Sequence, residues 1–193
     1  AKETGETLEA LIKETGNTEP ETRMQALMGE ILGRQGDLEG SKAQIDLAAE
    51  ASFKAHAKGI QVRALKARAW WESQGGDQAA AKATAEQALA ISNKIGAKFQ
   101  SVQLMGLLGE IAVASADGPA AIGHFTAMQK AAEAAGSSLF RAMALYGLAA
   151  AAPSGKVAKQ QVTEAQKLVK KLGDGLDAES RTFFFSLPER ARV

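Results

Sequence analysis

One short motif occurs twice in this chain, and the distance between its copies constrains the fold more than any single residue. The copies lie eighty residues apart, at 27–32 (LMGEIL) and 107–112 (LLGEIA). Asp37 and Asp117 follow them at the same offset, and Gly76-Asp77 lies midway between. A period of forty residues falls in the range of about 20–50 that is typical of repeat arrays. Such an array offers a surface for holding another molecule, which argues against a catalytic pocket.

Composition excludes several classes of function. The chain has 193 residues and nearly balanced charge, with 23 Lys+Arg against 22 Asp+Glu, so no overall field steers it to nucleic acid or an anionic membrane. It has no cysteine, which rules out disulfides and thiol chemistry. No apolar run approaches the length of about 18 residues that a membrane span needs, so we expect no membrane insertion. We expect a cytoplasmic protein, with the periplasm as the alternative.

The chain begins Ala1-Lys2-Glu3-Thr4, without an initiator methionine, which we interpret as a segment excised from a larger protein. Within it, glycine and aspartate separate segments of helix-forming composition. A glycine just past a helix supplies the left-handed residue that ends it, and an aspartate after that glycine caps the next helix. We therefore expect helices at about 21–35, 38–57, 60–74, 77–95, 98–115, 118–135, 138–152 and 156–172.

These helices pair into four hairpins that together span 17–173, at about 17–59, 60–96, 97–136 and 137–173. Residues 1–16 are expected to be the tail of a preceding repeat helix, and 174–193 a C-terminal capping helix and tail. The run Phe183-Phe184-Phe185 would cover the apolar end of the last hairpin, or else dock a partner or a missing domain. No such cap precedes the first hairpin, so self-association through that end stays open.

At this point the residues resemble the tetratricopeptide repeat (TPR) family. The first repeat carries Met28-Gly29, Gly36-Asp37-Leu38, Ser41, Ile45 and Ala48, and the third carries Leu108-Gly109, Asp117, Ala121, Phe125 and Met128. The period exceeds the family's usual length of about 34 residues, and the early aromatic and the repeat-ending proline are missing. The chain is similar to the degenerate, long-repeat branch found in bacterial multidomain signalling proteins. The resemblance implies an all-α fold, a right-handed superhelix of helical hairpins.

The resemblance also implies a concave groove, lined by the first helix of each hairpin, that binds a peptide or a partner domain. Regularly placed arginines there would take the carboxylates of a peptide by bidentate hydrogen bonds. The alternative is a solvated face whose charges pair with one another. The candidate partner-binding residues are Arg23, Glu30, Arg34, Gln61, Arg68, Trp71, Glu72, Gln103, Glu110 and Arg141.

Among the apolar residues, the pair Trp70-Trp71 is the feature that most strongly indicates a binding surface. Adjacent residues of a helix point about 100° apart, so we expect one ring to pack between repeats and the other to stand at the groove. A tryptophan at a binding surface is a typical hot-spot residue. The alternative is that both rings belong to the core.

Catalytic and metal chemistry find little support. His56 and His124 lack carboxylate or cysteine companions at ligand spacing, and no catalytic triad, nucleophile elbow or phosphate loop is present. We expect no enzyme activity, no metal and no cofactor. The lysines of 156–172 would suit an acidic surface, although a solvated face is the simpler interpretation.

These observations favour a non-catalytic protein-interaction scaffold that serves a larger bacterial signalling or regulatory protein. A second hypothesis is a sensor module that binds a small effector and relays its occupancy to an attached output domain. RNA binding is disfavoured, because the net charge is near zero and no aromatic residue recurs from hairpin to hairpin.

Overall fold

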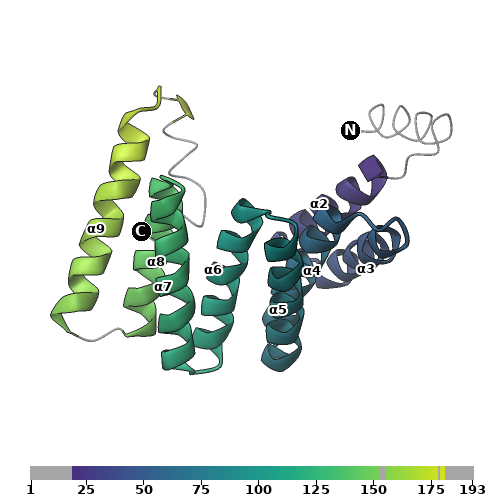
Figure 1. Cartoon of the computed structure of the whole chain (residues 1–193), viewed down its shortest axis with the longest axis horizontal. Coiled ribbons are helices and arrows are strands. Elements are labelled where there is room, and N and C mark those ends of the chain that lie inside the picture. The colour runs from purple at the N-terminus through teal and green to yellow at the C-terminus, as the bar shows by residue number, and fades with distance from the viewer. Residues whose placement is uncertain (1–18, 153–154, 178, 181–193) are drawn as a thin grey trace. The chain divides into compact units, whose positions relative to one another are not determined.

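The computed structural model describes residues 19–152, 155–177 and 179–180. Over these residues the chain is all-α, as expected, and Figure 1 shows the helices following one another along the chain. The expected helix tail at 1–16 and the apolar run at 183–185 lie outside the described residues. The helices are α2 (Glu19–Arg34), α3 (Leu38–Lys54), α4 (Lys58–Gln74), α5 (Gln78–Lys94), α6 (Lys98–Ala114), α7 (Gly118–Ala134), α8 (Ser138–Ala151) and α9 (Lys156–Asp174).

The helices keep a strict register. From α3 to α8 each helix begins twenty residues after the one before it, so each hairpin repeats every forty residues. The helices of α3 to α7 all have seventeen residues and are joined by three-residue turns. The eighty residues between the two motif copies are therefore two repeats of a forty-residue structural unit made of two helices.

One residue in each turn adopts a left-handed backbone conformation, and it recurs every twenty residues. The six residues with positive φ in this register are Gly36, His56, Gly76, Gly96, Ala116 and Gly136. The sequence placed the second turn at Gly59, but α3 ends at Lys54 and Gly59 lies inside α4. His56 takes the turn position with φ of 53°, because the packing register outweighs the local preference for glycine.

Aspartate caps the second helix of three successive hairpins, as the sequence predicts. The side chains of Asp37, Asp77 and Asp117 accept hydrogen bonds from backbone amides three residues on, over 2.8, 3.0 and 3.1 Å. Each bond satisfies one amide that the first turn of a helix leaves without a partner. Ser137 caps α8 in the same way, at 3.4 Å.

The chain divides into two compact units, Ala1–Leu104 and Met105–Val193. Within the first unit α2 packs on α3, α4 on α5, α3 on α4, and the first helices α2 and α4 on each other. A cluster of four buried alanines, Ala26, Ala48, Ala49 and Ala64, joins α2, α3 and α4. Alanine at a helix contact lets two axes approach toward the lower end of the usual range of about 8–10 Å.

Within the second unit α7 packs on α8 and α8 on α9. The ring of Phe125, on α7, is buried between glycines of two other helices, Gly109 on α6 and Gly147 on α8. A Cβ atom at Gly109 would lie 2.6 Å from the ring, and one at Gly147 would lie 2.3 Å from it. The mid-helix glycine of the repeated motif is therefore required by close packing.

Candidate partner-binding surface

Four of the ten predicted binding residues lie on α4, on the side that faces α3. Gln61 is fully buried, and its Nε2 donates a hydrogen bond of 3.0 Å to the carbonyl of Ser52 near the end of α3. The same carbonyl also accepts a hydrogen bond from the amide of Ala57 over 3.0 Å, so the side chain of Gln61 ties α4 to the end of α3 and the turn between them. The prediction for Gln61 is therefore corrected, because its side chain stabilises a turn and is not accessible to a partner.

Arg68, Trp71 and Glu72 lie on the same side of α4. The indole Nε1 of Trp71 donates to the carbonyl of Leu38 over 2.8 Å, and Nε of Arg68 donates to Glu72 over 2.9 Å. Glu72 is only 7% exposed. Between α3 and α4 lies a cavity of about 20 Å³, room for about one water, lined by Lys42, Ile45, Asp46, Arg68 and Trp71. Trp71 therefore joins α4 to α3, Arg68 lines the cavity between these two helices, and Glu72 pairs with Arg68 on α4 itself.

Both tryptophans pack within the fold. A Cβ atom at Gly33 of α2 would lie 2.4 Å from Cζ3 of Trp70, so this ring packs directly on α2. Trp71 packs on α3, with Nζ of Lys42 5.8 Å from its ring centroid. The structure thus supports the alternative that both rings are packing residues, each of them half-buried.

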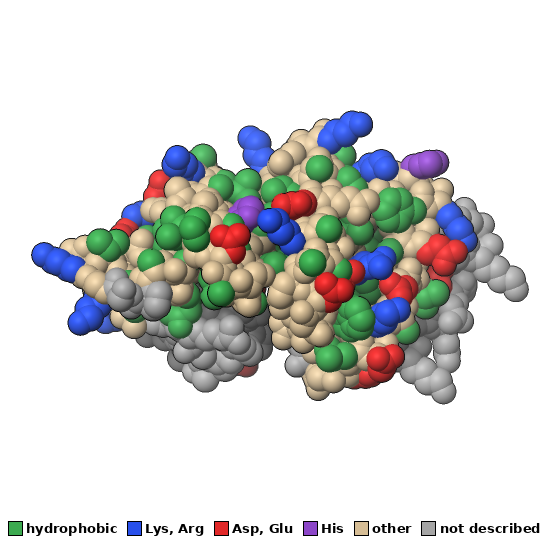
Figure 2. All heavy atoms as spheres, turned by 90° about the horizontal axis from the view of Figure 1, so that it is seen from below, with side chains coloured by type: hydrophobic (Ala, Val, Ile, Leu, Met, Phe, Trp, Pro, Cys, Tyr) green, Lys and Arg blue, Asp and Glu red, His purple; other side chains and the backbone are tan. Residues whose placement is uncertain are grey.

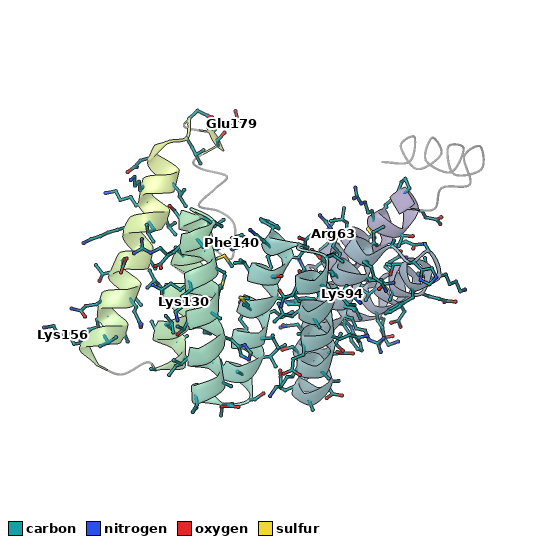
Figure 3. All side chains as sticks on the ribbon, viewed as in Figure 1. Arg63, Lys94, Lys130, Phe140, Lys156 and Glu179 are labelled. Atoms are coloured by element: carbon teal, nitrogen blue, oxygen red, sulfur yellow. The ribbon has the colours of Figure 1, made fainter. Side chains whose placement is uncertain are left out.

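The opposite side of α4 carries a polar row that joins three first helices. Nζ of Lys66 lies 3.4 Å from Oε1 of Glu30 on α2 and 3.4 Å from Oε1 of Gln103 on α6. The side chains of Lys66 and Glu30 keep about a quarter of their area in solvent, at 22% and 26%. Arg63, labelled in Figure 3, is exposed one turn before Lys66. Arg23 is exposed two turns before Glu30.

We call these five residues the first-helix surface: Arg23, Glu30, Arg63, Lys66 and Gln103. Sequence reasoning found three of them and missed Arg63 and Lys66. A signal for them was present in the forty-residue register, which aligns Arg23 with Arg63 and with Gln103. Position 63 of α4 is equivalent to position 23 of α2 and position 103 of α6. The register therefore predicts that Arg63 shares a side with Arg23 and Gln103, and that Gln61 and Arg68 do not.

The remaining predicted residues are Arg34, Glu110 and Arg141. The side chain of Arg34 lies outside the described residues, and Glu110 is exposed on α6 in the second unit. Arg141 of α8 hydrogen-bonds Glu164 of α9, and its Nε lies 3.4 Å from Glu133 of α7. Arg141 therefore ties three helices of the second unit together.

An apolar stripe lies exposed on α2 next to the first-helix surface. Met24, Leu27, Met28 and Ile31 are 42–49% exposed, at the spacing that places them on one face of a helix. Eighty residues later the same register positions hold Leu104, Leu107, Leu108 and Ile111, all of which are buried. We call the four α2 residues the α2 stripe; it is a face that is buried elsewhere in the repeat.

Charges of both signs are interspersed over the face of the molecule that Figure 2 shows, in line with the balanced composition. Among the described residues, no three His, Asp or Glu side chains gather as a metal site needs. No helix in the described part is both long and apolar enough to cross a membrane.

Comparison of the sequence with models of known protein families and with curated proteins found no match.

Proposed function

We propose that this chain is a non-catalytic, TPR-like scaffold that binds a peptide or partner domain on its first-helix surface. It would serve a larger bacterial signalling or regulatory protein. The strict register supports the repeat assignment, because hairpins that recur every forty residues present equivalent positions side by side. The partner contacts are assigned to Arg63, Lys66 and Gln103 together with Arg23 and Glu30.

The observation that carries the proposal is the α2 stripe beside the first-helix surface. Four large apolar side chains on one helix face are unusual on the surface of a protein that binds nothing there, and such patches mark protein-interaction sites. Arg23 and Glu30 lie along one edge of the stripe, so apolar contact and charge-based selection are available together. Exposed ion pairs contribute only about 0–1 kcal/mol each, so the apolar contact supplies most of the affinity and the charges select the partner.

The experiment is a quantitative pull-down from cells of the source organism with three forms of the chain. Arg63→Glu reverses a charge on the first-helix surface, and Lys82→Glu makes the same change on an exposed position of α5. We expect a partner that wild type and Lys82→Glu retain and that Arg63→Glu loses. Circular dichroism would confirm that all three forms are folded.

A partner held equally by all three forms would contradict the placement of the site. The sensor hypothesis makes a different prediction, namely that one small metabolite raises the melting temperature of the chain. A ligand that binds only the folded state stabilises it by RT ln(1 + [L]/Kd). Such stabilisation, without any captured protein, would replace the scaffold by the sensor.

A further inference from the structure

The contact between α3 and α4 shows how a first helix packs on the hairpin before it. The cavity between these two helices is lined on the α3 side by Lys42, Ile45 and Asp46. On the α4 side it is lined by Arg68 and Trp71. Because these two side chains cover the α3 residues, only about 20 Å³ remains open between the helices.

The core of the last hairpin repeats that of the second hairpin, but without a following first helix. In the second hairpin a buried cluster joins α4, α5 and the next first helix, α6; its members are Val62, Leu65, Ala88 and Leu104. The matching cluster of the last hairpin takes all its members from α8 and α9: Ala142, Leu145, Ala165 and Val169. Its two α8 members lie eighty residues after the two α4 members. The contribution that Leu104 makes from α6 has no counterpart in this described cluster.

The register continues into α9 with a shift of three residues. The buried residues of α7 include Ala121, Met128 and Ala132. Each has a buried counterpart 37 residues later on α9, at Ala158, Ala165 and Val169. The first helix between them, α8, has 14 residues where α6 has 17, which accounts for the shift.

A groove between α8 and α9 is therefore the counterpart of the α3–α4 cavity. Its α9 side includes Lys159, Val162 and Thr163, which occupy the register positions of the three α3 residues that line that cavity. Its α8 side includes Tyr146 and Ala150. The groove has a volume of about 530 Å³, so the space that α4 fills at the first hairpin is open at the last one.

The α2 stripe holds the positions that a first helix uses for this contact. Met28 and Ile31 lie forty residues before Arg68 and Trp71. The first member of the stripe, Met24, lies eighty residues before the buried Leu104 of α6. The stripe is therefore a first-helix face of the kind that packs on a preceding hairpin, and the α8–α9 groove is a hairpin surface of the kind that receives it.

We infer that the α2 stripe of one copy of this chain packs into the α8–α9 groove of a second copy, as α4 packs on α3 within one chain. The register places Met28 and Ile31 against Lys159, Val162 and Thr163 of the other copy. This contact rests on the proposed function, which takes the α2 stripe as a binding face, and it names the partner domain there as the last hairpin of a second copy. Stacking of one repeat on the next is the contact by which repeat proteins bury their apolar faces.

The single charged residue among those that line the groove fits an apolar partner. Lys159 is exposed, so its ammonium group stays in water while its aliphatic stem covers apolar surface. Its counterpart Lys42 does the same within the chain, with Nζ 5.8 Å from the ring centroid of Trp71. Ile31 takes the place of Trp71 in the second copy, so the lysine stem again lies on an apolar side chain.

The edges of the two surfaces are complementary as well. Within the chain, Oε1 of Gln103 on α6 lies 3.4 Å from Nζ of Lys66 on α4. The residues at these positions in the contact between copies are Arg23, eighty residues before Gln103, and Tyr146, eighty residues after Lys66. An arginine over a tyrosine ring is a favourable pair.

Stripe and groove are different surfaces, so the contact is heterologous and each bound copy still offers one of each to further copies. A copy with a defective stripe keeps a working groove, and a copy with a defective groove keeps a working stripe. Two such variants should therefore bind each other even though neither binds itself.

The test is sedimentation velocity of the whole chain at about 1–300 μM, because association follows mass action. Ile31→Glu places a charge in the stripe and Ala150→Glu places one in the groove, and both positions are exposed, so neither change opens the core. Leu47→Glu is the matched control, because Leu47 and Ile31 are both 49% exposed and Leu47 lies on α3, outside both surfaces. Circular dichroism checks that every form is folded.

We expect wild type and Leu47→Glu to sediment faster as the concentration rises. Ile31→Glu and Ala150→Glu should each self-associate at least about tenfold more weakly in Kd, and an equimolar mixture of the two should form a one-to-one complex. Arg63→Glu should self-associate like wild type, because Arg63 belongs to neither surface.

Three results would overturn the inference. One is a wild-type chain that stays monomeric over the whole range, which would mean that another segment or another protein covers the two surfaces. Another is association that Ile31→Glu abolishes and Ala150→Glu does not, which would pair stripe with stripe. The third is a mixture of these two variants that stays monomeric.

These failures are distinguishable from failure of the proposed function. A monomeric chain that captures a protein partner, lost in Arg63→Glu, refutes the contact between copies alone. A chain that self-associates as expected and captures no other protein refutes the partner contacts assigned to Arg63, Lys66 and Gln103 and leaves the contact between copies standing.

Discussion

Because Gly109 packs on the ring of Phe125, we predict that Gly109→Ala lowers the free energy of unfolding, although alanine has a higher helix propensity than glycine. A Cβ atom at Gly109 would lie 2.6, 2.7 and 2.8 Å from Cζ, Cε1 and Cε2 of Phe125. Favourable carbon contacts lie at about 3.5–4.0 Å, so Gly109→Ala requires the ring to move by about 1 Å. The ring has no room to move toward α8, because it also packs so tightly on Gly147 that a Cβ atom there would lie 2.3 Å from Cε1 of the ring.

Two free energies oppose each other in this substitution. Overpacking of a buried site costs about 1–3 kcal/mol, whereas replacing a mid-helix glycine by alanine gains about 0.8–1.0 kcal/mol. Because the ring is held from both sides, we expect the upper part of the first range. Gly109→Ala should therefore lower the free energy of unfolding by about 1–2 kcal/mol, which for a chain of this length lowers the melting temperature by about 2–8 °C.

The assay is urea and thermal unfolding followed by circular dichroism at 222 nm. Gly123→Ala is the matched control, because Gly123 is an exposed residue of α7 with nothing within 4 Å of its Cβ position. It should stabilise the chain by about 0.5–1 kcal/mol through helix propensity alone. In a Phe125→Leu background, which lacks the three clashing atoms, Gly109→Ala should change sign and become stabilising. Equal stabilisation by Gly109→Ala and Gly123→Ala in the wild-type background would refute the reasoning.

The remaining predictions concern turns, caps and the contact between hairpins. Ala116 has φ of 56° in a turn position where Gly76 has φ of 88°. Ala116→Gly should therefore stabilise the chain and Gly76→Ala should destabilise it, each by about 0.5–1 kcal/mol in urea unfolding. Effects of the same sign would contradict this. Asp77→Ala removes the N-cap bond of α5 and should lower the thermal midpoint, at a cost of about 1 kcal/mol; an unchanged midpoint would show that the cap contributes nothing. Trp71→Phe removes the indole hydrogen bond to the start of α3 and should cost about 0.5–1.5 kcal/mol, measured by the fluorescence of Trp70; no loss would mean that this bond does not join the hairpins.

Most helix boundaries could be predicted from the sequence, because Gly-Asp turns carry their own chemistry. The expected helices at 98–115, 118–135 and 138–152 end within one residue of α6, α7 and α8. The starts of α2 and α4 and the end of α9 differ from the prediction by two residues, and the largest difference is at the end of α3, predicted at 57 and found at Lys54. His56 gives no local sign that it takes a left-handed conformation, since that conformation is imposed by the spacing of the packed helices.

The candidate surface was harder to predict than the fold. A first helix buries residues against the hairpin before it and against its own second helix, so its polar residues on both sides look alike in sequence. Gln61 and Arg68 lie on the α3 side and Lys66 on the other, and the choice depends on a rotation of about 100° per residue. The forty-residue register resolves this choice once it is applied strictly to α4.

Complementary side-chain volumes also follow that register. Gly29 faces Ile45 and Gly109 faces Phe125, with Cβ positions 2.6 Å from the larger side chain in both cases. At the intervening repeat the same positions hold two buried alanines, Ala69 and Ala85. A large residue of the second helix thus faces glycine and a small one faces alanine, and this matching of volumes is visible in the sequence only after the repeat is aligned.

Photo-crosslinking in cells of the source organism tests the central claim most directly. A benzoylphenylalanine residue would be placed at position 63 on the first-helix surface, or at position 83, which is exposed on α5. Partner binding at the first-helix surface predicts a crosslinked protein from position 63 that is absent, or at least about tenfold weaker, from position 83. Crosslinks from position 83 alone, or equal crosslinks from both positions, would contradict it.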